Sequence, residues 1–351
     1  MAIEGLSRKL RTWRFLIGTG RKLSKENVGS KLIIPEFYRG VKRSGFWEYL
    51  GSSNPKTIEE VIDRFRIQRK EYLRSVFDLL VDKQVLMPML NDLGDRAYCV
   101  NEKALKKWLK LSPTYEKSFA PFFESSEKNE LIMRYLQGKK TAFISRDEMI
   151  KWYKTLSEEF HKTGRELLMT FGGNESFRGK HILDLGCGFG DEIQQLYERF
   201  NGDCRITGID FDGALVEIAK RREVTDQNGK TKRLGDLQNV KILTVDPGKP
   251  FPLDDESVDT VFCFAQLYWP KPEQQKLEIQ ESCRVLRAGG RLLVAGIFDP
   301  NNPLVLWVQP HGGHGFVSRS DFTQWCKDAG VEKQSFGVLG GLFVGEKVSS
   351  G

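Results

Sequence analysis

The sequence predicts an α/β fold in which a doubly wound, mostly parallel sheet follows a smaller, mainly α-helical region. Three observations lead to this fold class. From residue 179 onward, short apolar runs alternate with helical patterns, as expected of parallel strands joined by right-handed helical crossovers. Three glycines occupy alternate positions after the first run, in HILDLGCGFG. Before residue 179 the apolar residues recur mainly at helical spacing.

Five apolar runs predict the parallel strands: HILDLG, RITGID, VKILTVD, VDTVFCF and RLLVAGIF. The segments DEIQQLYERF, GALVEIAKRRE and PEQQKLEIQESCRVLR between them have helical patterns. A further helix is expected over SDFTQWCKDAG, with Ser320 as its N-cap. The last two runs, KQSFGVL and LFVGEKV, are separated by GG, so a tight antiparallel hairpin is expected to end a Rossmann-like sheet.

The front of the chain predicts three helices and a hairpin. Helical spacing over PEFYRGVKRSGFWEYL gives the first helix, and the capping box of Thr57 and Glu60 starts the second. RKEYLRSVFDLLVDKQ gives the third, and VLMPMLNDLGDRAYCV alternates on both sides of a glycine turn. This order of elements indicates a winged helix. We therefore expect four regions: a basic arm (1–35), a winged-helix domain (36–105), a helical connector (106–178) and the α/β domain (179–347).

Composition and charge restrict the functional classes. The chain has 351 residues and a net charge of +7, and residues 1–50 alone hold eleven Lys and Arg against four Glu, a balance of +7. We read this basic end as a solvated face rather than a nucleic-acid site. No apolar run approaches the roughly 20 residues of a membrane span. The six scattered cysteines contain no C-x-x-C pair, so we expect no metal site and a reducing, cytoplasmic compartment.

The glycine loop predicts a ligand that lies close to the backbone. Gly186, Gly188 and Gly190 follow the first strand, at the edge where such sheets bind ligands. The spacing is G-x-G-x-G, and Asp191 and Glu192 begin the next helix. Because carboxylates there would repel a pyrophosphate, we expect a ligand with cationic character instead.

Acidic and aromatic residues end the neighbouring strands. Asp210 closes TGIDFD and is placed to accept hydrogen bonds from ribose hydroxyls. Phe211 follows it and can cover an aromatic base, while Asp246 in TVDPGKPFPL can receive an exocyclic amine. Phe264 and Ala265 end the fourth strand. We thus predict a nucleoside across the tips of the first strands.

Four segments in order, ILDLGCGFG, TGIDFD, PFPLDDESVDTVFCF and RVLRAGGRLLV, resemble the successive motifs of class I S-adenosylmethionine-dependent methyltransferases. The resemblance covers residues from about 179 to 347. It implies S-adenosylmethionine as cofactor, with Asp210 on the ribose and Asp246 at the adenine end. Phe264 and Ala265 would lie near the sulfonium and the substrate. The methionine part would be flanked by a group of loop residues: Asp184, Gly186, Cys187, Gly188 and Gly190.

The front domain and connector resemble those of small-molecule O-methyltransferases. In that family the front domain forms a homodimer and helps to close the substrate pocket, so a homodimer and a small-molecule substrate are implied. The alternative is a winged helix that binds DNA. Basic residues around the third helix support this alternative: Arg64, Arg66, Arg69, Lys70 and Arg74. Because Glu71 and Asp78 interrupt these residues, we favour dimerisation.

The general base departs from the family pattern. The O-methyltransferases carry a His-Asp-Trp stretch after the fourth strand, where this chain has Leu267 and Tyr268 before Trp269. Candidate substitutes are His311 and His314 in VQPHGGHGF, a connection whose glycines would let it move as a lid. Tyr268 is a third candidate. An acceptor that ionises easily would need no strong base.

The sequence therefore predicts an S-adenosylmethionine-dependent methyltransferase acting on a small molecule through an O, S, N or C nucleophile. Two alternatives stay open at this point. One is an enzyme that binds the cofactor but uses its positive charge for a non-methylating reaction. The other is a DNA-binding winged-helix sensor of the cofactor.

Overall fold

A computed structural model of the chain describes residues 28–51, 55–111, 113–139, 141, 159–225, 229–337 and 340–349. The chain divides into two compact units. One comprises Glu159–Pro300 and His314–Gly351, and the other comprises Ser24–Glu158 and Asn301–Gly313. Within the part of the chain that the structure describes, no helix is long and apolar enough to cross a membrane.

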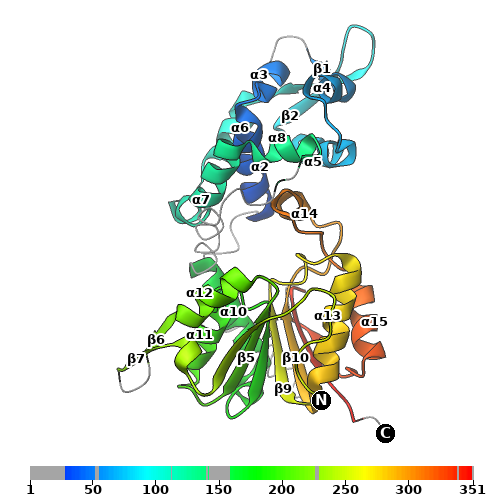
Figure 1. Cartoon of the computed structure of the whole chain (residues 1–351). Coiled ribbons are helices and arrows are strands. Elements are labelled where there is room, and N and C mark those ends of the chain that lie inside the picture. Colours follow the sequence, from blue (N-terminus) through cyan, green and yellow to red (C-terminus); the bar gives the residue numbers. More distant parts are fainter. Residues whose placement is uncertain are drawn as a thin grey trace. The chain divides into compact units, whose positions relative to one another are not determined.

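The first unit is built on a seven-stranded sheet (Figure 1). Its strand order is β11-β12-β10-β9-β4-β5-β8. Strands β4, β5, β8, β9 and β10 pair in parallel, whereas β12 pairs antiparallel with both β10 and β11. The strand bounds are β4 His181–Leu185, β5 Arg205–Asp210, β8 Val240–Thr244, β9 Val258–Phe264, β10 Leu286–Ala295, β11 Ser335–Phe336 and β12 Leu342–Glu346. The predicted mostly parallel sheet with a terminal hairpin is confirmed.

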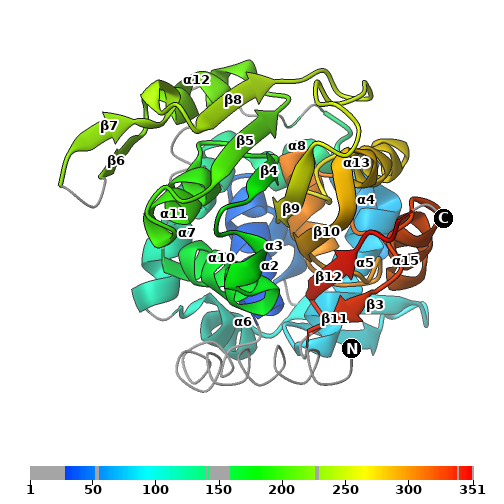
Figure 2. The ribbon, with the colours of Figure 1, turned by 90° about the horizontal axis from the view of Figure 1, so that it is seen from below.

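Helices cover both faces of this sheet, as Figure 2 shows. On one face lie α10 Glu159–Gly172, α11 Asp191–Arg199 and α12 Gly213–Arg221, and on the other lie α13 Pro272–Val285 and α15 Arg319–Asp328. Side chains alternate between two cores because successive strand residues point to opposite faces. Ile182 packs in the core under α10, α11 and α12, whereas Leu183 and Leu185 pack in the core under α13 and α15.

Local signals explain several element ends in this unit. Helix α11 begins after Gly190, which has a positive φ of 79°, and α12 begins at Asp212, whose side chain accepts from the Ala214 N–H. The predicted cap of α15 was wrong by two residues: the Ser318 hydroxyl, not that of Ser320, accepts from the Asp321 N–H. A small hairpin, β6 Glu223–Thr225 and β7 Thr231–Arg233, was not predicted.

The second unit begins with two helices where one was expected. They are α2 Val28–Lys42 and α3 Phe46–Leu50, and the chain turns between them at Gly45, which has φ 77°. The predicted capping box is present at the start of α4, Ile58–Phe65: Thr57 accepts from the Glu60 N–H, and the Glu60 carboxylate accepts from the Thr57 N–H.

A third helix and a small sheet follow. Helix α5 spans Lys70–Asp82, and strands β2 Leu86–Leu90 and β3 Arg96–Val100 form the predicted hairpin, with β1 Lys56–Thr57 on the other side of β3. Helices α6 Glu102–Leu109, α7 Pro113–Asn129 and α8 Leu131–Leu136 complete this part. The expected basic arm falls largely on residues 1–27, outside the described residues. Residues 142–158 of the expected helical connector also lie outside the described residues.

The segment Asn301–Gly313 belongs to the second unit although it follows β10 of the first. It forms α14 Val305–Val308 and a short turn of helix, Gln309–His311. Leu306 is a buried member of the second unit's core, and its carbonyl accepts from the Tyr72 hydroxyl at 2.7 Å. The segment that was expected to be a glycine-hinged lid therefore packs into the core of the second unit. Because this unit combines two separate stretches of the chain, its bounds differ from the predicted consecutive domains.

Candidate functional site

The glycine loop takes the backbone conformation that its sequence predicts. After β4, Gly186, Gly188 and Gly190 all have positive φ, of 76°, 47° and 79°. Residues other than glycine rarely adopt this backbone conformation. A Cβ on Gly186 would also lie 2.4 Å from the Oε1 atom of Gln266. Gln266 is itself buried. Glycine at 186 is therefore required both by the turn and by the closeness of a neighbouring side chain.

Asp210 holds this loop in place from the end of β5. Its Oδ2 accepts from the Gly188 N–H at 2.9 Å, and its Oδ1 accepts from the Asp212 N–H at 2.8 Å. Burial raises the pKa of Asp210 to about 6, against the lowering effect of these backbone hydrogen bonds. The residue thus combines a structural task with a carboxylate placed at the tip of a central strand.

Asp184 lies fully buried in β4, directly before the loop. Neither of its carboxylate oxygens has a hydrogen-bond partner. Burial raises its pKa well above the usual range, and the neighbouring Glu192 carboxylate raises it further. A buried acid without partners is costly, so this position fits a ligand that brings hydrogen-bond donors or positive charge.

The acids at the start of α11 differ from this picture. Asp191 is bound by the Arg222 guanidinium at 2.6 Å, and Glu192 is bound by Arg165 at 3.3 Å. Arg165, on α10, is buried and also donates from Nε to Gln195 at 2.8 Å. Asp191 and Glu192 are thus neutralised by arginines, and Asp184, rather than these two acids, is the residue that favours a cationic ligand.

The charge around the loop stays negative after these pairings. Two guanidinium groups face four carboxyl groups, so the formal balance is 2 − 4 = −2 when all are ionised and still 2 − 3 = −1 when Asp184 is protonated; the residues are Arg165, Arg222, Asp184, Asp191, Glu192 and Asp210. Such a site disfavours phosphates and suits a cationic ligand. Among the described residues, no group of three or more His, Cys, Asp or Glu side chains is arranged to hold a metal ion.

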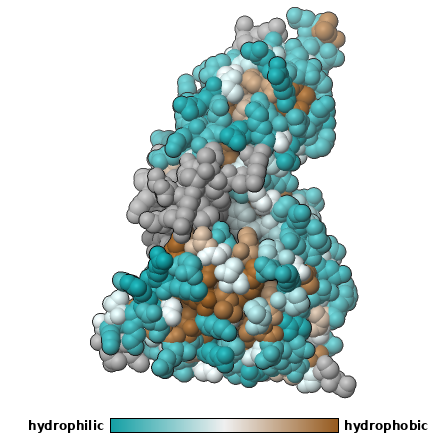
Figure 3. Space-filling model, in the orientation of Figure 1, coloured by the Kyte–Doolittle hydropathy of each residue, from teal (hydrophilic) through white to brown (hydrophobic). Residues whose placement is uncertain are grey.

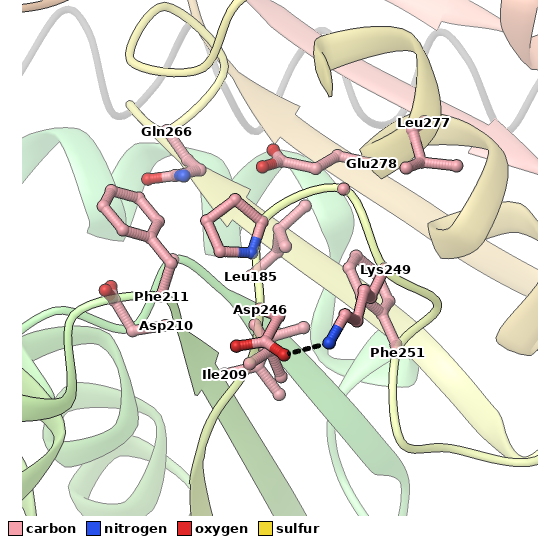
Figure 4. Close-up of a pocket in the computed structure, with 14 residues that line it drawn as sticks. Leu185, Ile209, Asp210, Phe211, Asp246, Lys249, Phe251, Gln266, Leu277 and Glu278 are labelled. Atoms are coloured by element: carbon pink, nitrogen blue, oxygen red, sulfur yellow. Dashed lines mark hydrogen bonds and ion pairs between the residues drawn. The ribbon is translucent and has the colours of Figure 1, made fainter. Parts of the chain in front are cut away.

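A hollow opens beside the loop (Figure 4). Figure 3 shows hydrophobic residues on the same unit between α12 and α13. Four predicted cofactor residues line the hollow: Gly186, Asp210, Phe211 and Asp246. The other lining residues are Leu185, Ile209, Val245, Pro247, Gly248, Lys249, Phe251, Gln266, Leu277 and Glu278.

The residues at the open end of this hollow are solvated. Phe211, which directly follows β5, is 47 % exposed, and the Asp246 carboxylate pairs with the Lys249 ammonium at 2.6 Å, both side chains being largely exposed. An exposed ring beside an acid leaves a flat face for an aromatic base.

Six predicted cofactor residues do not line the hollow: Asp184, Cys187, Gly188, Gly190, Phe264 and Ala265. Burial raises the pKa of the Cys187 thiol well above its usual range, so Cys187 behaves as a small core residue. The Phe264 ring lies 5.8 Å from the Arg165 guanidinium carbon. Ala265 has a positive φ of 56°, a strained conformation for a residue with a side chain.

The three predicted base candidates lie in different settings. The His311 Nε2 lies 2.7 Å from the Glu36 Oε1, both side chains being buried within the second unit. Tyr268 packs against Trp269 and Phe316, and burial raises the pKa of its hydroxyl. His314 is exposed in the first unit, with its backbone N–H bonded to the Tyr268 carbonyl at 2.8 Å.

Sequence reasoning missed Arg165, Gln266 and Glu278 as site residues. Arg165 interrupts an apolar helix pattern, and a charged residue at such a position was the available signal. Gln266 follows the fourth strand directly, at the ligand-binding edge. No signal marked Glu278, because α13 is rich in charged residues along its length.

Comparison with known proteins agrees with this geometry. Residues 176–326 match a family model described as a methyltransferase domain. The chain is 25 % identical over 169 residues to a ubiquinone biosynthesis O-methyltransferase of Coxiella burnetii, covering 44 % of this chain and 65 % of that protein. It is 24 % identical over 196 residues to a demethylmenaquinone methyltransferase of Staphylococcus epidermidis, covering 54 % of this chain and 75 % of that protein.

A solved structure extends the similarity of fold to nearly the whole chain. The citrinin polyketide synthase CMeT domain superposes with a TM-score of 0.67 at 13 % sequence identity, covering 97 % of this chain and 95 % of that chain. At this identity the likeness concerns the fold alone. It includes the second unit as well as the Rossmann-like one.

Proposed function

We propose, from the premise that residues 176–326 belong to the methyltransferase-domain family, that this chain transfers a methyl group from S-adenosylmethionine to a small molecule. The observation that carries the proposal is the buried Asp184 carboxylate, which lacks partners beside a glycine loop of net negative surroundings. A phosphate-bearing dinucleotide would be repelled there, whereas a sulfonium nucleoside with an ammonium group would be attracted.

The residues present fit such a cofactor along the strand tips. We assign the ribose to Asp210 and the adenine end to Phe211 and Asp246, while the methionine part falls to a loop group: Asp184, Gly186, Cys187, Gly188 and Gly190. Phe264 and Ala265 are assigned to the surroundings of the sulfonium. When bound, S-adenosylmethionine supplies a methyl group on a cationic sulfur.

The contribution of the protein to methyl transfer is then mainly alignment. Holding two reactants in a productive geometry is worth roughly 7–11 kcal/mol. The base candidates differ in fitness: the Tyr268 hydroxyl has a raised pKa, and His311 is engaged by Glu36. His314 keeps an exposed ring, so we propose it as the first candidate for proton transfer.

An acceptor that ionises readily fits this modest set of bases. Leu267, which occupies the place where O-methyltransferases carry histidine, is buried and cannot take a proton. We therefore propose an enol or phenol, methylated at oxygen or at an adjacent activated carbon. The name of one similar protein, a ubiquinone biosynthesis O-methyltransferase, supports oxygen as the acceptor atom.

Calorimetry and turnover together test the proposal. The protein should bind S-adenosylhomocysteine and ignore nicotinamide dinucleotides, and labelled S-adenosylmethionine should yield a labelled small phenol or enol from a panel of acceptors. Binding without any transfer would instead favour a non-methylating enzyme. Salt-sensitive binding of duplex DNA, with the cofactor left intact, would favour a sensor.

For the second unit we propose a winged-helix dimerisation domain. Helices α3, α4 and α5 with the β2–β3 hairpin support it, and the hairpin exposes a group of apolar side chains: Met87, Met89, Leu90 and Leu93. Exposed apolar surface of this kind is typical of an interface. Sedimentation should detect a homodimer that Leu90→Glu with Leu93→Glu converts to a monomer; a wild-type monomer would contradict this assignment.

A further inference from the structure

Glu278 is a carboxyl group inside the hollow to which the proposed function gives no task. It projects from α13 on the opposite side from Asp210, next to Gln266 (Figure 4). Its Oε2 atom is enclosed and has no hydrogen-bond partner. An enclosed polar atom without a partner is costly in a folded protein, so its position asks for a ligand.

The surroundings keep this carboxyl group protonated at neutral pH. Burial, with a smaller contribution from the Asp210 carboxylate on β5, raises the pKa of Glu278 to about 8. The Glu278 carboxylate also contributes to the raised pKa of the Cys263 thiol on β9. Asp246 and Lys249 line the same hollow and form an ion pair with each other. Below pH 8 Glu278 is therefore a neutral acid with one donor and one acceptor.

Hydrogen-bond donors are scarce at the neighbouring end of the hollow. Pro247 has no N–H group, and the Lys249 ammonium is bound to Asp246. Three main-chain N–H groups are already used within the protein: Val245 donates to Asp210, Lys249 to Asp246 and Phe251 to Glu281. These three N–H groups are therefore not available to a ring nitrogen of a bound base, whereas the Glu278 carboxyl group lines the same hollow.

We propose that the Glu278 carboxyl group recognises the adenine ring, accepting a hydrogen bond from the exocyclic amine and donating its proton to a neighbouring ring nitrogen. The inference rests on the proposed cofactor. Glu278 shares the hollow with the nucleoside residues Asp210, Phe211 and Asp246, which favours the base over the methyl acceptor as its partner. Glu278 is then a specificity-determining residue for the purine.

Two substitutions separate the hydrogen bonds from the charge. Glu278→Gln keeps one acceptor and gains an amide donor, so it reproduces the neutral acid and cannot ionise. Glu278→Leu keeps the approximate size and removes both hydrogen bonds. Glu273→Gln, at an exposed position of the first turn of α13, is the matched control on the same helix.

Calorimetry with S-adenosylhomocysteine and with 5′-methylthioadenosine measures the effect. The second probe lacks the amino acid group, so its affinity reports the nucleoside alone. At pH 6.5 we expect Glu278→Gln to stay within about threefold of the wild type and Glu278→Leu to bind about 10- to 100-fold more weakly, the range for two lost hydrogen bonds. Between pH 7 and 9.5 the wild type should lose about tenfold and Glu278→Gln should not change.

The outcomes distinguish this inference from the proposed function. A wild-type protein that binds neither probe contradicts the cofactor itself. If the wild type binds and Glu278→Leu binds equally well, the adenine assignment alone is overturned. It is also overturned if Glu278→Leu changes the pH profile of turnover while both probes bind as before, since that result would make Glu278 a base toward the acceptor. Replacing ring N1 or N7 of the nucleoside by CH should weaken wild-type binding and leave Glu278→Leu unaffected for one of the two analogues.

Discussion

Substitution of Gly186 by alanine tests how closely the glycine loop and Gln266 depend on each other. The new Cβ has to share space with the Gln266 amide, 2.4 Å from Oε1 and 2.5 Å from Cδ, at a backbone φ of 76°. A left-handed conformation costs a residue with a side chain roughly 1–2 kcal/mol, and overpacking a buried site costs about 1–3 kcal/mol. We therefore expect Gly186→Ala to lower the free energy of unfolding by about 2–5 kcal/mol.

Gly179 offers a matched control in the same unit. Its φ is 68°, yet a Cβ there would meet no atom within 4 Å, so Gly179→Ala should cost only the roughly 1–2 kcal/mol of the backbone conformation. The double variant Gly186→Ala/Gln266→Ala removes the clash. It should recover about 1–3 kcal/mol of the loss in a double-mutant cycle.

Urea unfolding, fitted by linear extrapolation, measures these differences. Calorimetry with S-adenosylhomocysteine on the same variants reports whether the loop still binds. Equal losses for Gly186→Ala and Gly179→Ala, or no recovery on removing the Gln266 side chain, would show that the contact does not govern the loop.

Three further predictions concern single buried groups. Burial lowers the pKa of His181, so the folded protein resists a proton that the unfolded chain accepts below about pH 6.5; stability should fall as the pH falls from about 6.5, and His181→Gln should flatten this part of the urea midpoint curve. Asp210→Ala removes the acceptor of the Gly188 N–H and should weaken S-adenosylhomocysteine binding about 10- to 100-fold by calorimetry, the range for hydrogen bonds to a charged group. Glu36→Ala removes the buried carboxylate that pairs with the His311 ring and should cost about 3 kcal/mol in urea unfolding; no measurable loss of stability would contradict this role.

The α/β sheet was predictable because each strand carries its own signal. The runs around Ile182 and Ile206 are apolar enough for strands that are buried on both faces, and glycines mark the first turn. The Thr57 capping box and the Asp212 cap act through residues only two or three positions away, so local sequence suffices. Ser320 was a poor choice of cap because Ser318 offers the same chemistry two residues earlier.

The site was predictable only where its residues end strands. Asp210 and Asp246 follow from the rule that ligands bind at the carboxyl edge of such sheets. The pairing of Asp191 with Arg222 and of Glu192 with Arg165 depends on contacts across 31 and 27 residues, which no periodicity reveals. Glu278 could not be predicted for a different reason. Helix α13 buries several polar residues, among them Gln275, Glu281 and Ser282, so its sequence does not show which polar residue faces a ligand.

The membership of Asn301–Gly313 in the second unit has a practical consequence for dissecting this protein. The stretch that matches the methyltransferase family, 176–326, includes these thirteen positions, so a boundary drawn from sequence similarity cuts through a folded body. An excised fragment would keep Leu306 and lose the core in which it is buried. Low solubility or activity of that fragment would then result from the exposed segment and would not show whether the α/β unit works on its own. Experiments on cofactor binding are best done on the intact polypeptide, in which Asn301–Gly313 keeps its packing within the second unit.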